Sequence, residues 1–222
     1  MVSGRTMSKS GSSASPSSWP HYDDDQIAAV ARVLASGKTN YWTGSECRHF
    51  EREFAIHFDM PFAISLANGT VALELALIAF GIGHDDEVIV PAASYIASAG
   101  CVAVRGARPV FADVDEHTQN ISAKTIEPLI NSRTRAVIVV HLHGVPCDMA
   151  AILKLAKKQK LLVIEDCAQA HGAQYRGQPA GSLGDAAAFS FCQDKIISTG
   201  GEGGMLLFRD RIAWQNGWSY KD

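Results

Sequence analysis

One lysine, Lys195, stands between an apolar segment that ends at Phe191 and a glycine-rich run from Gly200 to Gly204. Desolvation disfavours a buried ammonium in general, and a free amine is both a nucleophile and a base. Glycines also let the backbone pass close to a bulky flat ligand. Lys195 is therefore a candidate for covalent attachment of a cofactor, and an exposed loop lysine beside a flexible tract is the alternative.

A second candidate is Asp166, which follows the apolar run 161–164. A carboxylate at the end of a central strand is partly desolvated, so it needs a cation, a metal ion or a protonated ring nitrogen as partner. A helix cap or a structural salt bridge would also satisfy it. His141 and His171 could join Asp166 as metal ligands. His141 and His143 are the only closely spaced histidine pair that accompanies them, and we predict no metal site.

Three more segments carry polar or aromatic side chains where strands are expected to end. Gly69 and Thr70 lead into a helix, whose free N–H groups and dipole favour a phosphate, although an ordinary helix cap has the same pattern. No nucleotide P-loop motif accompanies them. Tyr95 could stack on a planar ring or pack a helix onto the sheet, and Ser190 could donate to a phosphate. Together these residues favour pyridoxal phosphate, with Lys195 as its covalent anchor.

The scaffold for these residues is an alternation of short apolar runs and helical patterns that begins at Pro61. Continuous runs of valine, isoleucine and leucine are typical of strands that are covered on both faces. The pattern predicts an α/β fold with a mainly parallel central sheet, helices on both faces, and a ligand site at the carboxyl ends of the strands. Strands are expected over residues 62–66, 87–90, 109–114, 136–142, 161–165, 186–191 and 204–208, and helices over 71–80, 94–105, 122–130 and 148–158.

Residues 1–18 are rich in serine and glycine and are predicted to form a disordered tail. Residues 19–222 are assigned to an N-terminal segment and one large domain. The segment holds two amphipathic helices, one stopped by Gly37 and one capped by Ser45. The net charge of −3, with no basic block and no long apolar run, argues against nucleic-acid and membrane partners. Five scattered cysteines without a CxxC pair favour a reducing, cytoplasmic compartment.

The order and spacing of the motifs resemble the DegT/DnrJ/EryC1/StrS family of pyridoxal-phosphate-dependent sugar aminotransferases, which belongs to fold type I. The resemblance runs from about Asp24 to the last residue. Each motif is modest alone, but together they are specific. They are the segments 68–73, 86–91, 109–114, 141–144, 165–172 and 181–185 and the stretch around Lys195.

The resemblance implies a role for each candidate residue. Lys195 would bond the cofactor and Asp166 would pair with its ring nitrogen, so both are assigned as catalytic. Gln169 would lie near the 3-hydroxyl of the cofactor, and Tyr95 would stack on its ring. Ser94 stands where many members have threonine, and it keeps the hydroxyl. The cofactor phosphate would contact three residues: Gly69, Thr70 and Ser190.

The implied activity is amino-group transfer, with glutamate as the expected amino-acid donor, to a nucleotide-linked keto-sugar for polysaccharide, lipopolysaccharide or secondary-metabolite synthesis. A homodimer with the active site at the subunit interface is also implied. Family members are considerably longer than 222 residues, so the small C-terminal domain is expected to be missing here.

Three other functions fit parts of the sequence less well than aminotransfer does. Family members that dehydrate sugars carry histidine in place of Lys195, which disfavours that chemistry. A noncatalytic, regulatory member is disfavoured by the intact Lys195, Asp166 and Gln169, although the short chain is in its favour. A dinucleotide-dependent oxidoreductase fits the α/β pattern, but the first strand is not followed by GxGxxG.

Overall fold

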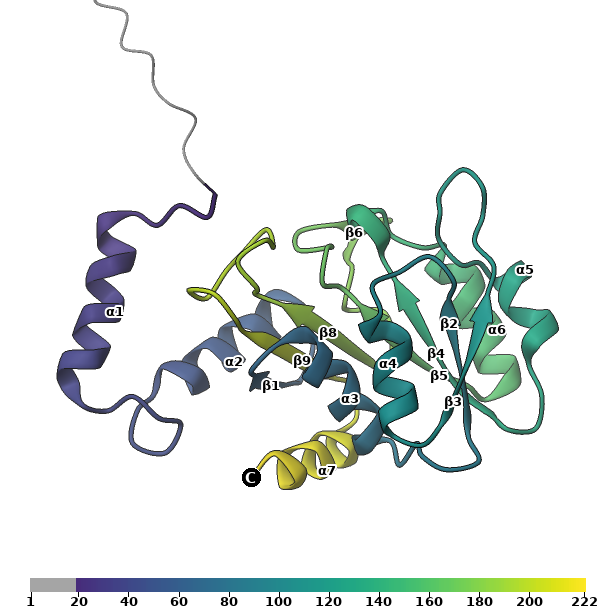
Figure 1. The fold of residues 1–222 in the computed structure, drawn as a ribbon, viewed down its shortest axis with the longest axis horizontal. Helices are drawn as coiled ribbons and strands as arrows, with labels where there is room; N and C mark the ends of the chain where they lie inside the picture. Colours follow the sequence, from purple (N-terminus) through teal and green to yellow (C-terminus); the bar gives the residue numbers. More distant parts are fainter. Residues whose placement is uncertain (1–18) are drawn as a thin grey trace, which may run out of the picture.

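The computed structural model describes residues 19–222 (Figure 1), and the tail predicted for residues 1–18 lies outside this range. A seven-stranded sheet forms the centre, in the order β1-β9-β8-β5-β4-β2-β3. A two-stranded hairpin of β6 (Gln174–Tyr175) and β7 (Gln178–Pro179) lies apart from it. The strands of the main sheet are β1 Phe62–Leu66, β2 Glu87–Pro91, β3 Arg108–Ala112, β4 Thr134–Val140, β5 Leu162–Asp166, β8 Ala186–Ser190 and β9 Gly204–Phe208.

The strand directions confirm a mainly parallel sheet. Strands β3, β2, β4, β5 and β8 pair in parallel. Strand β9 runs antiparallel to both of its neighbours, β8 and β1. Because two reversals cancel, β1 points the same way as β8. The carboxyl ends of β1, β2, β4, β5 and β8 therefore meet at one edge of the sheet.

Helices cover both faces of the sheet, as the sequence predicts (Figure 1). Helices α3, α4 and α7 pack on one face, where Ile64, Val90 and Ile164 point. Helices α5 and α6 pack on the other, over Val137 and Val163, and α2 covers the β8–β9 end of the sheet. The helices are α1 Asp24–Ser36, α2 Glu46–His57, α3 Gly69–Ala79, α4 Ala97–Val104, α5 Ala123–Ile126, α6 Met149–Gln159 and α7 Arg211–Lys221, with 3₁₀ turns η1 Glu127–Leu129 and η2 Leu142–Gly144.

Local chemistry explains most helix ends. Gly37 ends α1 in the left-handed conformation, at φ 67°. The Asn68 side chain caps α3 by accepting a 2.9 Å hydrogen bond from the Val71 N–H. Ser45 precedes α2, but its side chain makes no cap hydrogen bond. Pro128 follows α5, and the predicted helix over 122–130 is divided there because proline cannot donate within a helix.

Two helices differ from the expectations in how they begin or pack. The helix expected from Ser94 begins at Ala97, because the segment 92–96 forms the turn that leaves β2. No residue of α1 is buried, and its apolar side chains Ile27, Val30 and Leu34 are more than half exposed. Figure 1 shows α1 standing away from the sheet. Within residues 19–222, no helix combines the length and apolarity that crossing a membrane requires.

Candidate active site

A cavity of about 480 Å³ opens at the sheet edge where the parallel strands end. Its walls come from the segments that follow β1, β2, β4, β5 and β8, which is where the fold class predicts a ligand site. The structure thus brings every residue that was predicted to contact the cofactor to one place, and their roles toward a ligand remain predictions. The candidates that line it are Gly69, Thr70, Tyr95, Asp166, Gln169, Ser190 and Lys195.

Lys195 reaches this cavity from the loop between β8 and β9. Its ammonium lies 3.4 Å from the Asp194 carboxylate, and its side chain is 20% exposed. The loop is held at its base, where the Thr199 N–H donates to the Phe191 carbonyl at 3.2 Å. Gly201 has a φ of 139°, a conformation that favours glycine. Backbone contacts therefore hold the base of the loop. The lysine side chain projects from it to line the cavity.

Asp166 ends β5 and is buried at the floor of the cavity. One carboxylate oxygen accepts from the Ser98 hydroxyl and the other from the Ala168 N–H, each at 3.1 Å. Burial raises the pKa of Asp166, and these two hydrogen bonds and the charge of Lys195 oppose that rise. A carboxylate has about four acceptor positions, so Asp166 keeps acceptor capacity for a group bound in the cavity.

The start of α3 and the end of β8 meet at close range. A Cβ atom at Gly69 would lie 2.9 Å from the Cβ atom of Ser190, so this approach requires glycine. The first N–H groups of a helix have no partner within the helix. The Gly69 and Thr70 N–H groups and the Ser190 hydroxyl therefore line one wall, which suits an anion such as a phosphate.

The remaining two candidates that line the cavity are Gln169 and Tyr95. The Gln169 side-chain oxygen accepts from the His143 N–H at 2.7 Å, which orients its NH₂ group as the free donor. Tyr95 is 74% exposed. This exposure contradicts the alternative in which Tyr95 packs a helix onto the sheet, and it leaves the ring available to a ligand.

Sequence reasoning missed several residues of the cavity. Ser98 is 1% exposed and binds Asp166, and Cys192 and Glu202 line the wall near Lys195. Ser98 lies four residues after Ser94, and this helical spacing was the one available signal. Nothing in the sequence distinguishes Cys192 or Glu202 from ordinary loop residues.

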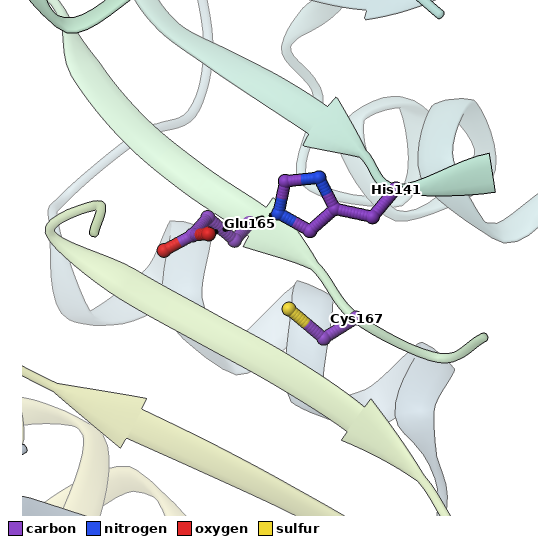
Figure 2. Close-up of side chains that lie close together, drawn as sticks. All are labelled: His141, Glu165 and Cys167. Atoms are coloured by element: carbon purple, nitrogen blue, oxygen red, sulfur yellow. Dashed lines mark hydrogen bonds and ion pairs between the residues drawn. The ribbon is translucent and has the colours of Figure 1, made fainter. Parts of the chain in front are cut away.

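A group of metal-ligand type lies behind the cavity, at His141, Glu165 and Cys167 (Figure 2). The Glu165 carboxylate accepts from His141 Nε2 at 2.8 Å and from the N–H groups of the 181–184 loop. His141 Nδ1 accepts from the Cys147 N–H at 3.2 Å. Both imidazole nitrogens of His141 are thus engaged, so the ring has no free lone pair for a metal.

The same group fixes the carboxylate beside it. Burial acts to raise the pKa of Glu165, but the hydrogen bond from His141 and the N–H donors of Gly184 and Gly181 hold it below its ordinary value. Glu165 is therefore an ionised clamp between β5 and the 181–184 loop, and it does not face the cavity.

His171, the other histidine considered as a ligand, lies elsewhere. It is 8% exposed, and its ring packs against Phe189 and Phe191 at centroid distances of 5.5 and 5.7 Å. Burial lowers the pKa of His171 to about 4. Neither ring nitrogen has a hydrogen-bond partner within residues 19–222. His171 is thus a neutral, aromatic-packed residue beneath the end of β8.

Comparison with known proteins gives consistent findings. GDP-perosamine synthase from Caulobacter vibrioides is 54% identical over 199 residues, 85% of this chain and 53% of that protein. An aminotransferase from Psychrobacter cryohalolentis superposes with a TM-score of 0.91 at 52% identity, over 93% of this chain and 52% of that one. The PLP form of Spr1654 from Streptococcus pneumoniae superposes with a TM-score of 0.84 at 30% identity, over 93% of this chain and 56% of that one.

The chain therefore spans about half the length of the curated relatives that it matches. The family model for the DegT/DnrJ/EryC1/StrS aminotransferase family matches residues 20–219, which is nearly all of the part that the structure describes. The match includes every strand of the sheet and every candidate of the cavity. The chain belongs to the DegT/DnrJ/EryC1/StrS aminotransferase family.

Proposed function

We propose that this protein is a pyridoxal-phosphate-dependent aminotransferase that transfers an amino group to a nucleotide-linked keto-sugar. The observation that carries the proposal is the meeting of Lys195, a buried strand-end Asp166 and a helix N-terminus around one cavity. The name of the Caulobacter relative supports a nucleotide-sugar substrate, and the PLP form of the Streptococcus structure supports the cofactor.

The residues of the cavity fit this cofactor in kind and in position. A protonated pyridine nitrogen needs a carboxylate to accept its hydrogen bond. Asp166 accepts two hydrogen bonds from the protein and keeps further acceptor positions for this one. A phosphate needs N–H and hydroxyl donors, and Thr70 and Ser190 line the wall at the start of α3. An aldehyde needs an amine, and Lys195 is the lysine that lines this cavity. Tyr95 would cover the ring face, and Gln169 would donate to the 3-hydroxyl.

Each of these residues has a defined part in the chemistry. Bound pyridoxal phosphate supplies an electron sink for breaking a bond at the substrate carbon. Asp166 would pair with the ring nitrogen and favour its protonated form, which makes the sink effective. The amine of Lys195 would hold the cofactor and, when free, would serve as the base and then the acid that moves a proton at the substrate carbon. The same two residues would act in the opposite direction when a keto-sugar receives the amino group.

Three finer assignments belong to the same proposal. Glutamate is the amino donor, and the enzyme is a homodimer with its active site at the subunit interface. Tyr95 lines the cavity, and Tyr95 and three isoleucines of the segments that follow β2 and β8 (Ile96, Ile196 and Ile197) are each at least half exposed, so a second subunit could cover them. A cytoplasmic location agrees with the five free cysteines.

Cofactor absorbance tests the proposed reaction in its two halves. Protein loaded with pyridoxal phosphate should change its absorption spectrum on addition of glutamate, and the change should reverse on addition of a GDP-, dTDP- or UDP-linked keto-sugar. Lys195→Ala should abolish both responses, whereas Lys157→Ala, on the exposed face of α6, should keep them. A spectrum that responds to neither amino acids nor keto-sugars would contradict the proposal.

A further inference from the structure

Two serine hydroxyls connect the cavity wall to Asp166. The Ser94 and Ser98 hydroxyl oxygens lie 2.7 Å apart, and the Ser98 hydroxyl lies 3.1 Å from Asp166 Oδ2. Ser94 is partly exposed and lines the cavity, whereas Ser98 is 1% exposed. Ser94, Ser98 and Asp166 therefore form a hydrogen-bonded row that leads from the cavity surface into the protein interior.

The number of protons fixes the direction of this row. A hydroxyl has one proton to donate, and an ionised carboxylate can only accept. Ser98 must therefore donate its proton to ionised Asp166. The bond between the two serines is then made by the proton of Ser94, and Ser94 faces the cavity with acceptor lone pairs only. When Asp166 is protonated, the row can reverse, and Ser94 can donate into the cavity.

The position of Ser98 favours a role in the site over a role in its own helix. Ser98 is the second residue of α4, where a serine often bonds to nearby backbone. Its hydroxyl instead bonds to a residue that is 68 positions away in the chain. A hydrogen bond to a charged group is stronger than one between neutral groups.

We propose that Ser98 is a positioning residue that keeps Asp166 ionised and aimed at the cavity, and that it sets the hydrogen-bonding polarity of Ser94 at the cavity wall. The assignment rests on the proposed function only for the nature of the group that Asp166 faces. The effect of Ser98 on Asp166 belongs to the cofactor-free protein.

Other titratable groups also face Asp166 and must be held constant in any test. His141 after β4 and Lys195 after β8 both favour the ionised carboxylate. Cys101 on α4 and Cys167 after β5 are buried thiols, and burial raises the pKa of Cys101 to about 12 and that of Cys167 well above its ordinary value. None of these four is changed in the variants that follow.

The test is a carboxyl titration of the cofactor-free protein by NMR with ¹³C-labelled aspartate, with the Asp166 signal assigned by its loss in Asp166→Asn. Ser98→Ala should raise the titration midpoint of Asp166 by about one pH unit, a tenfold change in proton affinity. Ser98→Thr, which keeps the hydroxyl, should restore the wild-type midpoint. Ser94→Ala should raise the midpoint by a smaller amount, about threefold in proton affinity.

An unchanged midpoint in folded Ser98→Ala would overturn the inference. Should Ser98→Ala fail to fold, Ser94→Ala decides, because an unchanged midpoint in that variant also contradicts the proton row. A protein that shows the shifts but never binds pyridoxal phosphate would refute the proposed function and leave the role of Ser98 standing.

Discussion

Asp166 is a carboxylate whose burial disfavours its ionised form. Its raised pKa means that the folded protein binds this proton more tightly than the unfolded chain does. The contribution of Asp166 to the free energy of unfolding therefore falls as the pH rises from the pKa of an aspartate in the unfolded chain to the raised pKa in the folded protein. Such a residue is retained for what it binds and not for what it adds to the fold.

Replacement of Asp166 should separate stability from activity. In cofactor-free protein at pH 7, we expect Asp166→Asn to raise the free energy of unfolding by about 1 kcal/mol, because a buried charge is removed and the amide still bonds to Ser98. Amino-group transfer should fall at least about 100-fold. Urea unfolding and a coupled assay measure the two effects, and Asp113→Asn, at an exposed position, should change neither. Full activity in Asp166→Asn would contradict its assigned role.

His171 should make stability depend on acid. Its pKa is lowered from 6.5 to about 4 by burial, so the unfolded chain binds the proton more tightly between these two values. Stability should therefore fall as the pH drops from about 6.5 to 4, by roughly 3 kcal/mol. Denaturant unfolding at pH 7 and pH 4.5 should show a smaller difference in His171→Phe than in wild type. His57→Phe, on the exposed face of α2, should keep the wild-type difference, and an equal loss in both variants would refute this origin.

At the scale of elements, the contact between α3 and β8 depends on Gly69. An added methyl group would lie 2.9 Å from the Ser190 Cβ atom and must displace the helix from the strand. We expect Gly69→Ala to lower the free energy of unfolding by about 1–3 kcal/mol and to weaken cofactor binding as well. Gly100→Ala, inside helix α4, is the matched control. A Cβ atom at Gly100 would have no neighbouring atom within 4 Å outside the backbone of its own helix. Gly100→Ala should be neutral or stabilise by about 0.5–1 kcal/mol. Thermal unfolding of both variants decides, and equal effects would contradict the close approach.

The Glu165 clamp holds β4, β5 and the 181–184 loop together. Removing one partner of a buried charged network leaves the others unpaired, so Glu165→Ala should cost about 3–5 kcal/mol of unfolding free energy. The exposed ion pair of Glu127 and Lys158 is the contrast, and Glu127→Ala should cost under about 1 kcal/mol. Urea unfolding compares them. A small loss in Glu165→Ala would contradict the role of Glu165 in joining β5 to the 181–184 loop.

Sequence patterns predicted the elements where local chemistry decides, and they failed where tertiary contacts decide. The strand over 62–66 and the strand over 204–208 were predicted at their observed bounds, because uninterrupted apolar runs mark them. Helix α7 was not predicted, since its apolar pattern is mixed with glycine and asparagine and it is held by packing on α3 and β1. The Glu165–His141 clamp is likewise invisible in the sequence, because its partners are 24 positions apart.

At the scale of the whole molecule, topology explains the site. Residues far apart in sequence meet because five strands end at the same edge, and the rule for parallel sheets locates that edge from the strand order. The sequence therefore predicted which residues would meet, but not their hydrogen-bond partners. The link from Ser98 to Asp166 needs the start of α4 to lie beside the end of β5, which no motif specifies.

The covalent bond between Lys195 and pyridoxal phosphate can be measured directly. Protein incubated with pyridoxal phosphate, treated with borohydride and digested should yield one peptide, the one containing Lys195, with the added mass of the reduced cofactor. Lys195→Ala should lose the label, and Lys157→Ala should keep it. An unlabelled protein, or the label on another lysine with Lys195 unmodified, would contradict the proposed active site.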